Sequence, residues 1–138
     1  MPPSLRYQLH AYFASCGFEI HGGTGIEGLP PAPLIANDGF GSGTSHRPAV
    51  IGFDPGARRI VFGVVRETRA ELDSEESLEE YNVFLDHNAG KGERASALYV
   101  IMPEELLPEW GDIVSHYIHR EYWERLFGVT GEGRPSRE

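Results

Sequence analysis

The sequence contains a single cysteine, and this scarcity removes two classes of site. Cys16 is the only cysteine in 138 residues, so neither a disulfide within the chain nor a zinc site built from cysteines is possible. A nucleophilic cysteine would need a neighbouring base. The surrounding stretch ASCGF instead predicts that Cys16 is a small buried side chain near the end of a helix.

Long apolar runs are also missing. None approaches the roughly 18 residues that a membrane-spanning helix requires. The N-terminus lacks the charged start and the apolar core that are typical of a secretion signal. We therefore expect a soluble, cytoplasmic protein that does not associate with a membrane.

Positive charge is scarce as well. The formal net charge is -9, which argues against a protein that coats nucleic acid without specificity, because that mode of binding depends on neutralising phosphates. A local basic face remains compatible with this overall balance.

The composition favours one globular domain. Hydrophobic residues make up 40% of the chain, which at this length suits one core and leaves no room for two. We expect a single domain over residues 1–128 and a polar tail over residues 129–138.

The hydrophobic pattern predicts helices alternating with strands. Ser4 is a candidate N-cap for a first helix, and Gly17 is a candidate stop. Residues rich in valine, isoleucine and phenylalanine flank the turn stretch DPGAR, which predicts a hairpin. The predicted elements are a helix at 4–15, a strand at 18–21, a hairpin at 49–54 and 58–67, a helix at 73–88, a buried strand at 95–103, and a helical region at 103–127 that is interrupted near Pro108 and Gly111.

This order of elements predicts an α/β fold with a small mixed central sheet flanked by helices. Residues 22–47 are rich in glycine and proline, and we expect them to form one long irregular loop of the kind that is usually functional or disordered. The phosphate-binding pattern G-x-x-x-x-G-K-S does not occur in this loop, so nucleotide binding is not expected there.

The stretch RPAVIGFDPGARRIVFGVVRE at residues 47–67 and the later stretch LYVIMPEELL carry a resemblance. A helix and a strand, then a hairpin of the form P-D-I-I-G-x-D-P and I-V-F-G-E-x-K, then a helix and a buried strand, resemble the restriction-endonuclease-like superfamily of PD-(D/E)XK nucleases. The resemblance covers roughly residues 4–107. It implies the fold of that superfamily and a site where acids bind Mg²⁺ while a lysine orients or polarises the attacking water.

The sequence departs from this family pattern at each position that carries the chemistry. On alignment, Ala49 replaces the metal-binding aspartate, Val64 replaces the glutamate and Arg66 replaces the lysine. Aliphatic side chains cannot bind Mg²⁺, and arginine cannot act as a base, although its planar fork suits phosphate. Val64 and Arg66 should still share one face of the strand. We therefore expect a catalytically degenerate domain with no catalytic residues, no metal site and no cofactor.

A magnesium-dependent nuclease with relocated ligands is the alternative. Glu19 on the first strand and Asp54 on the hairpin are then the candidate ligands for Mg²⁺. Strand alternation sends Asp54 to the face opposite Ala49, and the stretch DPG has the composition of a plain turn. The alternative therefore requires a bulge that reorients Asp54.

Arginines on or beside the hairpin indicate a binding role. Nucleic acid is a candidate ligand because arginine favours phosphate. Alternatively, some of these arginines pair with the acidic helix DSEESLEE, and the domain then acts through a protein partner or by self-association, with the aromatic stretch HYIHREYWERLF as a contact surface. The candidate binding residues are Arg47, Arg58, Arg59, Arg66 and Arg69.

The histidines offer two weaker hypotheses. His21 and His46 flank the long loop and could meet across it. His116 and His119 are three residues apart and would share one face of a helix, as in some transition-metal sites. Surface or partly buried histidines beside aromatic side chains are the commoner explanation of such a pair.

Overall fold

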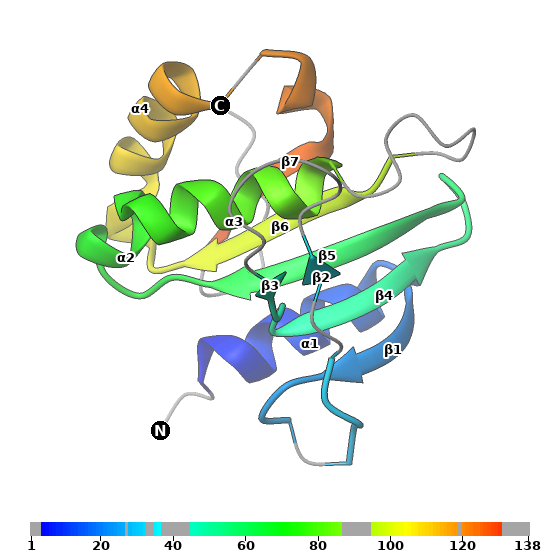
Figure 1. Ribbon diagram of the computed structural model, residues 1–138. Coiled ribbons are helices and arrows are strands. Elements are labelled where there is room, and N and C mark those ends of the chain that lie inside the picture. The colour runs from blue at the N-terminus through cyan, green and yellow to red at the C-terminus, as the bar shows by residue number, and fades with distance from the viewer. Residues whose placement is uncertain are drawn as a thin grey trace.

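A computed structural model describes residues 4–26, 28–32, 35–36, 45–86, 95–118 and 120–130 (Figure 1). Its helices are α1 (Leu5–Ser15), α2 (Arg69–Asp73), α3 (Glu75–Asp86) and α4 (Leu107–Tyr117), with 3₁₀ turns η1 (Glu104–Leu106) and η2 (Arg120–Arg125). Its strands are β1 (Glu19–Gly23), β2 (Ile35–Ala36), β3 (Ser45–His46), β4 (Val50–Asp54), β5 (Arg59–Val65), β6 (Ala97–Met102) and β7 (Leu126–Thr130).

The central sheet is mixed and has the strand order β1-β4-β5-β6-β7. Strands β1, β4 and β5 are antiparallel neighbours, whereas β6 and β7 continue the sheet in parallel. A parallel pair needs a long crossover, and α2 and α3 provide it between β5 and β6. The predicted α/β class with a mixed sheet flanked by helices is therefore confirmed.

Helices cover the two faces of the sheet with separate cores. Helix α1 packs on one face, while α2, α3 and α4 lie on the other (Figure 1). Strand β6 separates the two layers by simple alternation: Tyr99 and Ile101 join the core under α1, whereas Leu98, Val100 and Met102 join the core under α3 and α4. All six residues of β6 are buried, which confirms the predicted strand with two covered faces.

The first helix forms as its sequence predicts, with one exception. The hydroxyl of Ser4 accepts a hydrogen bond from the backbone N–H of Tyr7 at the N-cap, and Leu9 and Phe13 are buried one turn apart on one face. The prediction that Cys16 is buried is wrong, because Cys16 is exposed where the chain leaves the helix.

The closing region differs most from the prediction. Helix α4 runs through Pro108 and Gly111 without interruption, because Pro108 lies in the first turn, where a backbone N–H needs no partner within the helix. The helical region ends earlier than expected, and Leu126–Thr130 forms β7. The sheet therefore extends two residues into the segment predicted to be a polar tail.

The expected loop at residues 22–47 contains regular structure in its described part. Strand β1 continues to Gly23, and β2 pairs with β3 to form a separate two-stranded sheet. Gly23, Gly25 and Gly28 have the G-x-G-x-x-G spacing. The described chain continues from them into turns, without the helix that a dinucleotide site requires.

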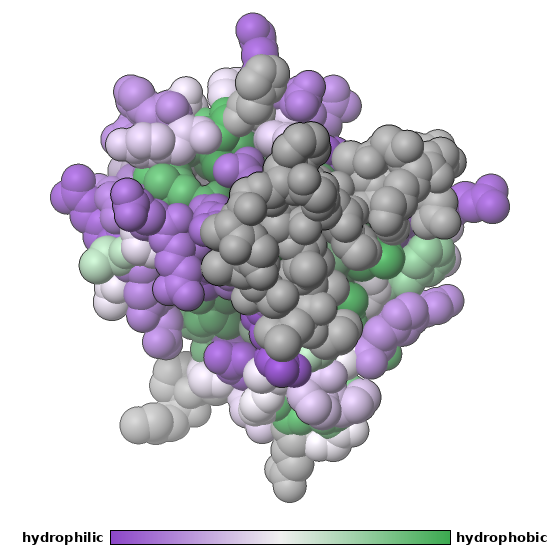
Figure 2. Space-filling model, in the orientation of Figure 1, coloured by the Kyte–Doolittle hydropathy of each residue, from purple (hydrophilic) through white to green (hydrophobic). Residues whose placement is uncertain are grey.

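None of the described helices is long and apolar enough to cross a membrane. Figure 2 shows mainly hydrophilic side chains over the described part of one face, with small hydrophobic areas between them.

Gly52 on β4 allows the backbone of β1 to approach closely. A Cβ atom at Gly52 would lie 2.5 Å from the carbonyl oxygen of Glu19, and a backbone atom in a sheet cannot move aside as a side chain can. We expect Gly52→Ala to lower the free energy of unfolding by about 1–3 kcal/mol, the usual range for overpacking. Urea unfolding followed by circular dichroism measures this loss.

Gly111→Ala provides the matched control. A Cβ atom at Gly111 in α4 meets no other atom within 4 Å, and alanine is favoured over glycine in a helix by about 1 kcal/mol. This variant should therefore be more stable than the wild type. Equal urea midpoints for Gly52→Ala and Gly111→Ala would contradict the close approach of the two strands.

Candidate functional site

The structure brings together Ala49, Val64 and Arg66, the three residues that the resemblance aligned with catalytic positions. Ala49 lies just before β4 and donates a backbone hydrogen bond of 2.8 Å to the carbonyl of Gly63 on β5. Val64 lies near the end of β5, and Arg66 follows the last residue of that strand. All three line one hollow of about 230 Å³, which also receives Glu80 from α3. We call this the arginine hollow, because Arg6 and Arg47 line it as well.

Arg66 is held by three contacts on the α3 side of the sheet. Its Nη2 atom forms an ion pair and hydrogen bond with Oε1 of Glu80, and its Nη1 atom donates to the carbonyl of Val65 at 3.0 Å. The guanidinium carbon lies 5.4 Å from the centre of the Tyr81 ring, a cation–π contact. The prediction that Val64 and Arg66 point to the same side is confirmed, because Val64 belongs to the core beneath α3.

His46 holds the second oxygen of the same carboxylate. Its Nδ1 atom lies 3.2 Å from Oε2 of Glu80, and its Nε2 atom lies 3.6 Å from Oε2 of Glu79. His46 is buried, with 6% of its side chain exposed. The hypothesis that His46 meets His21 is wrong, because His21 is exposed on β1 beside Glu19.

Burial and neighbouring side chains shift the pKa values of Arg66 and Tyr81. Burial opposes the charged form of Arg66, but the neighbouring Tyr81 and Glu80 outweigh that penalty, so the pKa of the guanidinium is raised. Burial also raises the pKa of the Tyr81 hydroxyl, while Arg66 acts in the opposite direction. The Tyr81 hydroxyl donates a 2.9 Å hydrogen bond to the carbonyl of Leu72. Arg66 therefore stays charged and Tyr81 stays neutral near neutral pH.

The other two arginines are positioned by backbone carbonyls. Arg6 on α1 donates from Nη1 to the carbonyl of Thr24 at 2.6 Å, and Arg47 donates from Nη1 to the carbonyl of Ala32. Each guanidinium has five N–H donors, so one such bond fixes the group and leaves others for a ligand. Sequence reasoning missed Arg6, because α1 is distant from the hairpin in sequence. It also missed Glu80 as a specific partner, although it allowed that arginines pair with this acidic helix.

A second hollow adjoins the first and differs in charge. It has a volume of about 390 Å³ and shares Arg6, Arg66 and Glu80 with the arginine hollow. The added wall carries acids at the start of α2 and α3. Glu71 accepts a 2.6 Å hydrogen bond from the backbone N–H of Glu67. The exposed acids of this acidic hollow are Glu67, Glu71 and Glu76.

The candidate metal ligands Glu19 and Asp54 lie at the other end of the hairpin. Glu19 pairs with Phe53, whereas Val50 at the opposite end of β4 pairs with Gly63. The five residue-to-residue steps from Ala49 to Asp54 span roughly 17 Å of extended strand. The β4–β5 register is continuous, so the bulge that would reorient Asp54 is not there.

Both of these carboxylates also have local roles. Oδ1 of Asp54 accepts hydrogen bonds from the backbone N–H groups of Gly56 at 2.9 Å and Ala57 at 3.2 Å, as expected of a turn residue. Glu19 lies 3.6 Å from Nε2 of His21. Within the described residues, no three His, Cys, Asp or Glu side chains are grouped so that they could hold a metal ion.

The five candidate binding arginines do not form one patch. Arg47 and Arg66 line the arginine hollow, but Arg58 and Arg59 lie at the turn end of the hairpin, where Arg59 pairs with Asp54 across the strands. Arg69 on α2 lines a separate hollow with His116 of α4. The partner proposed for His116 in a metal site, His119, lies outside the described residues.

Comparison of the chain with protein-family models, with curated proteins and with solved structures found no match. The arginine hollow contains three guanidinium groups and one carboxylate, and that carboxylate is already bound on both oxygens. Such a set suits an anion and not a divalent cation.

Replacing Glu80 by glutamine should leave the buried guanidinium of Arg66 without a counter-charge. The two side chains are only 14% and 13% exposed, and breaking a buried ion pair costs about 3 kcal/mol. We expect that loss in the free energy of unfolding for Glu80→Gln and a similar loss for Arg66→Met. The free energy of unfolding of the double variant should fall by less than the sum of the two single losses, because the ion pair is removed only once.

Urea unfolding of the four proteins measures this coupling free energy. Glu76→Gln serves as the control, because Glu76 is an exposed acid on the same helix. It should change stability by less than about 0.5 kcal/mol. Strictly additive losses for Glu80→Gln and Arg66→Met would rule out a stabilising pair.

Proposed function

We propose that the chain is a restriction-endonuclease-like domain that binds nucleic-acid phosphates without cleaving them. The fold part of the proposal is supported by the order α1, β1, β4, β5, α3, β6, which is the order of elements on which the family resemblance rests. The observation that carries the functional part is the Arg66–Glu80 pair beside Ala49 and Val64.

The lack of suitable acids supports binding without cleavage. Hydrolysis by this family depends on carboxylates that share a metal ion. Ala49 and Val64 have none to offer, and Glu80 is engaged by both Arg66 and His46. A metal ion at Glu80 would have to displace a buried guanidinium from its counter-charge, which is costly in a desolvated environment.

The three arginines support a phosphate ligand. Arg6 and Arg66 are partly buried and Arg47 is exposed, so the hollow offers a charged entrance and a charged interior. Fixed guanidinium groups lose little freedom on binding, and their fork geometry matches phosphate oxygens.

The acids of the adjoining hollow limit the length of the contact. Glu67, Glu71 and Glu76 would repel a strand that continued in that direction. We therefore expect the hollow to contact about three phosphates. The dissociation constant for single-stranded DNA should then depend only weakly on salt, with a slope of log Kd against log salt concentration of about 2.

Fluorescence anisotropy with a labelled single-stranded oligonucleotide tests the binding proposal. Arg47→Ala should weaken binding about fivefold, since one charge-assisted contact at an exposed site contributes about 1 kcal/mol. It should also lower the salt slope by about 0.7. The oligonucleotide should stay intact on a gel after incubation with Mg²⁺ or Mn²⁺.

Arg69→Ala is the matched control, because it removes the same charge from an exposed residue that lies outside the arginine hollow. Its affinity should equal that of the wild type. Equal losses for Arg47→Ala and Arg69→Ala, or metal-dependent cutting of the oligonucleotide, would contradict the proposed function.

A further inference from the structure

The arginine hollow confines a positive surplus to a small volume. Its lining has three guanidinium groups and one carboxylate, which leaves a surplus of two positive charges. Its volume is about 230 Å³, below the roughly 300–1,000 Å³ of pockets that enclose a whole small-molecule ligand. A compact group with two negative charges therefore matches this hollow better than a larger ligand of low charge density.

The charge next to the hollow has the opposite sign on one side. The acidic hollow shares two of the three arginines with the arginine hollow, and its exposed acids are Glu67, Glu71 and Glu76. The residues that line only the arginine hollow are uncharged, apart from Arg47. A nucleic-acid strand can therefore reach the arginines over an uncharged wall, but it meets three carboxylates if it continues into the acidic hollow.

The charge of the whole chain acts in the same direction. The net charge of -9 repels phosphates that lie outside the hollow, over roughly the 8 Å Debye length of physiological salt. A phosphate within a strand has neighbouring phosphates on both sides, and one of them would lie toward the acids. A phosphate at the end of a strand has a neighbour on one side only, so it escapes this repulsion.

A terminal phosphate also suits three arginines better than an internal one. A phosphomonoester carries about 1.5 to 2 negative charges near pH 7 and has three acceptor oxygens, whereas a phosphate within a strand carries one charge. Arg6 and Arg47 each donate one hydrogen bond to a backbone carbonyl and keep further N–H donors. The additional charge and oxygen of the terminal group can therefore be bound.

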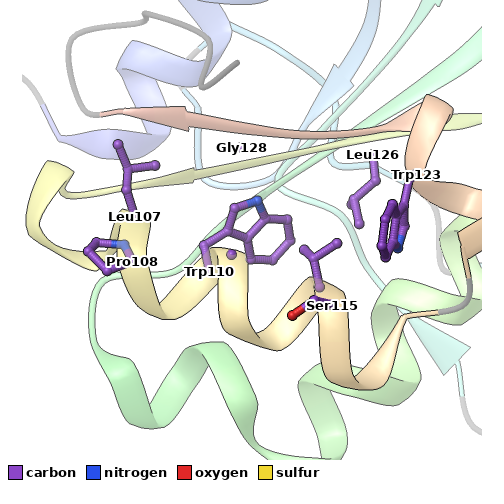
Figure 3. A pocket seen from close by; sticks show the side chains of 9 residues that line it. Leu107, Pro108, Trp110, Ser115, Trp123, Leu126 and Gly128 are labelled. Atoms are coloured by element: carbon purple, nitrogen blue, oxygen red, sulfur yellow. The ribbon is translucent and has the colours of Figure 1, made fainter. Parts of the chain in front are cut away.

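Two further hollows in the described part of the chain lack a matching charge. Figure 3 shows the hollow between α4 and β7, which is lined by uncharged residues such as Trp110 and Leu126. The hollow beside Arg69 has more acids than arginines, because its lining includes Asp73, Glu109 and Asp112. The arginine hollow is the better site for a dianion.

We propose that the arginine hollow binds the phosphomonoester at the end of a nucleic-acid strand, and that the strand leaves the hollow on the side away from the acidic hollow. This inference rests on the proposed nucleic-acid binding and names the part of the strand that the hollow takes. The 5′-phosphate and the 3′-phosphate have the same chemistry, and the two can be compared directly.

Fluorescence anisotropy with three oligonucleotides of one sequence tests the proposal. One has hydroxyl groups at both ends, one has a 5′-phosphate and one has a 3′-phosphate, and each carries its label on an internal base. At least one phosphorylated form should bind about tenfold more tightly than the hydroxyl form, because charge-assisted hydrogen bonds are added.

The same titrations separate this inference from the proposed function. Equal affinities for all three oligonucleotides, with the loss for Arg47→Ala retained, would overturn the preference for a strand end and leave nucleic-acid binding in place. No binding of any of the three would overturn both.

Arg47→Ala locates the terminal phosphate. Arg47 lines the arginine hollow and not the acidic hollow, so its loss should reduce the preference for the phosphorylated form from about tenfold to about threefold or less. Arg69→Ala is the control and should keep the full preference, since Arg69 lines neither hollow. An unchanged preference in Arg47→Ala would place the terminal phosphate elsewhere.

The repulsion by the acidic hollow has its own test. The double variant Glu67→Gln and Glu76→Gln should bind the hydroxyl oligonucleotide more tightly and so reduce the preference by at least about threefold. The double variant Glu104→Gln and Glu105→Gln is the matched control, because it removes the same charge from exposed residues of η1 that line neither hollow. Equal effects of the two double variants would trace the preference to net charge and overturn the role of the acidic hollow.

Competition distinguishes a strand end from a free phosphate compound. Adenosine 5′-monophosphate and inorganic phosphate provide the charged group without the rest of the strand. Each should displace the labelled phosphorylated oligonucleotide only at a concentration at least about tenfold above that of the unlabelled one, because the strand adds further phosphate contacts. Displacement by either compound at the same concentration as the unlabelled oligonucleotide would overturn the proposal.

Discussion

The ion pair between Arg66 and Glu80 determines what the end of the hairpin can hold. Both side chains are largely buried. Separating them would leave an unpaired charge in a region of low polarity, which is costly. His46 takes the remaining oxygen of Glu80 and ties the segment before β4 to α3. The carboxylate that lines the arginine hollow thereby serves the fold, while the guanidinium groups around it retain donors for a ligand.

The sheet and its helices keep two chemically different surfaces apart. The arginine hollow forms where β4 begins and β5 ends, with α1 and α3 each contributing a charged side chain. A second hollow, lined by Trp110 of α4 and Leu126 of β7 among others, lies between the last described helix and strand, and its lining is mainly apolar. The two hollows share no lining residue.

The parts of the fold that follow local rules could be predicted from the sequence. The alternating pattern of the hairpin, the continuous apolar run of β6 and the N-cap of α1 each depend on neighbours in sequence. Strand periodicity predicted that Val64 and Arg66 share one side, whereas the position of Ala49 beside them was implied only by the family resemblance. Strand β7 was missed because LFGVT follows an aromatic-rich stretch that has a helical pattern, and only pairing with β6 makes it a strand. Arg6, His46 and Glu80 meet through tertiary packing, which local spacing does not encode.

Titration of the metal-free protein with Mn²⁺, followed by calorimetry, tests most directly whether the end of the hairpin can hold a metal ion. Mn²⁺ prefers the same oxygen ligands as Mg²⁺. The arrangement of Arg66, Glu80 and His46 predicts no saturable heat up to about millimolar metal, the range of weak carboxylate sites. Saturable binding of about one or two ions per chain, as in metal-dependent nucleases, would contradict the account if Glu80→Gln, Asp54→Ala or Glu19→Ala abolished it.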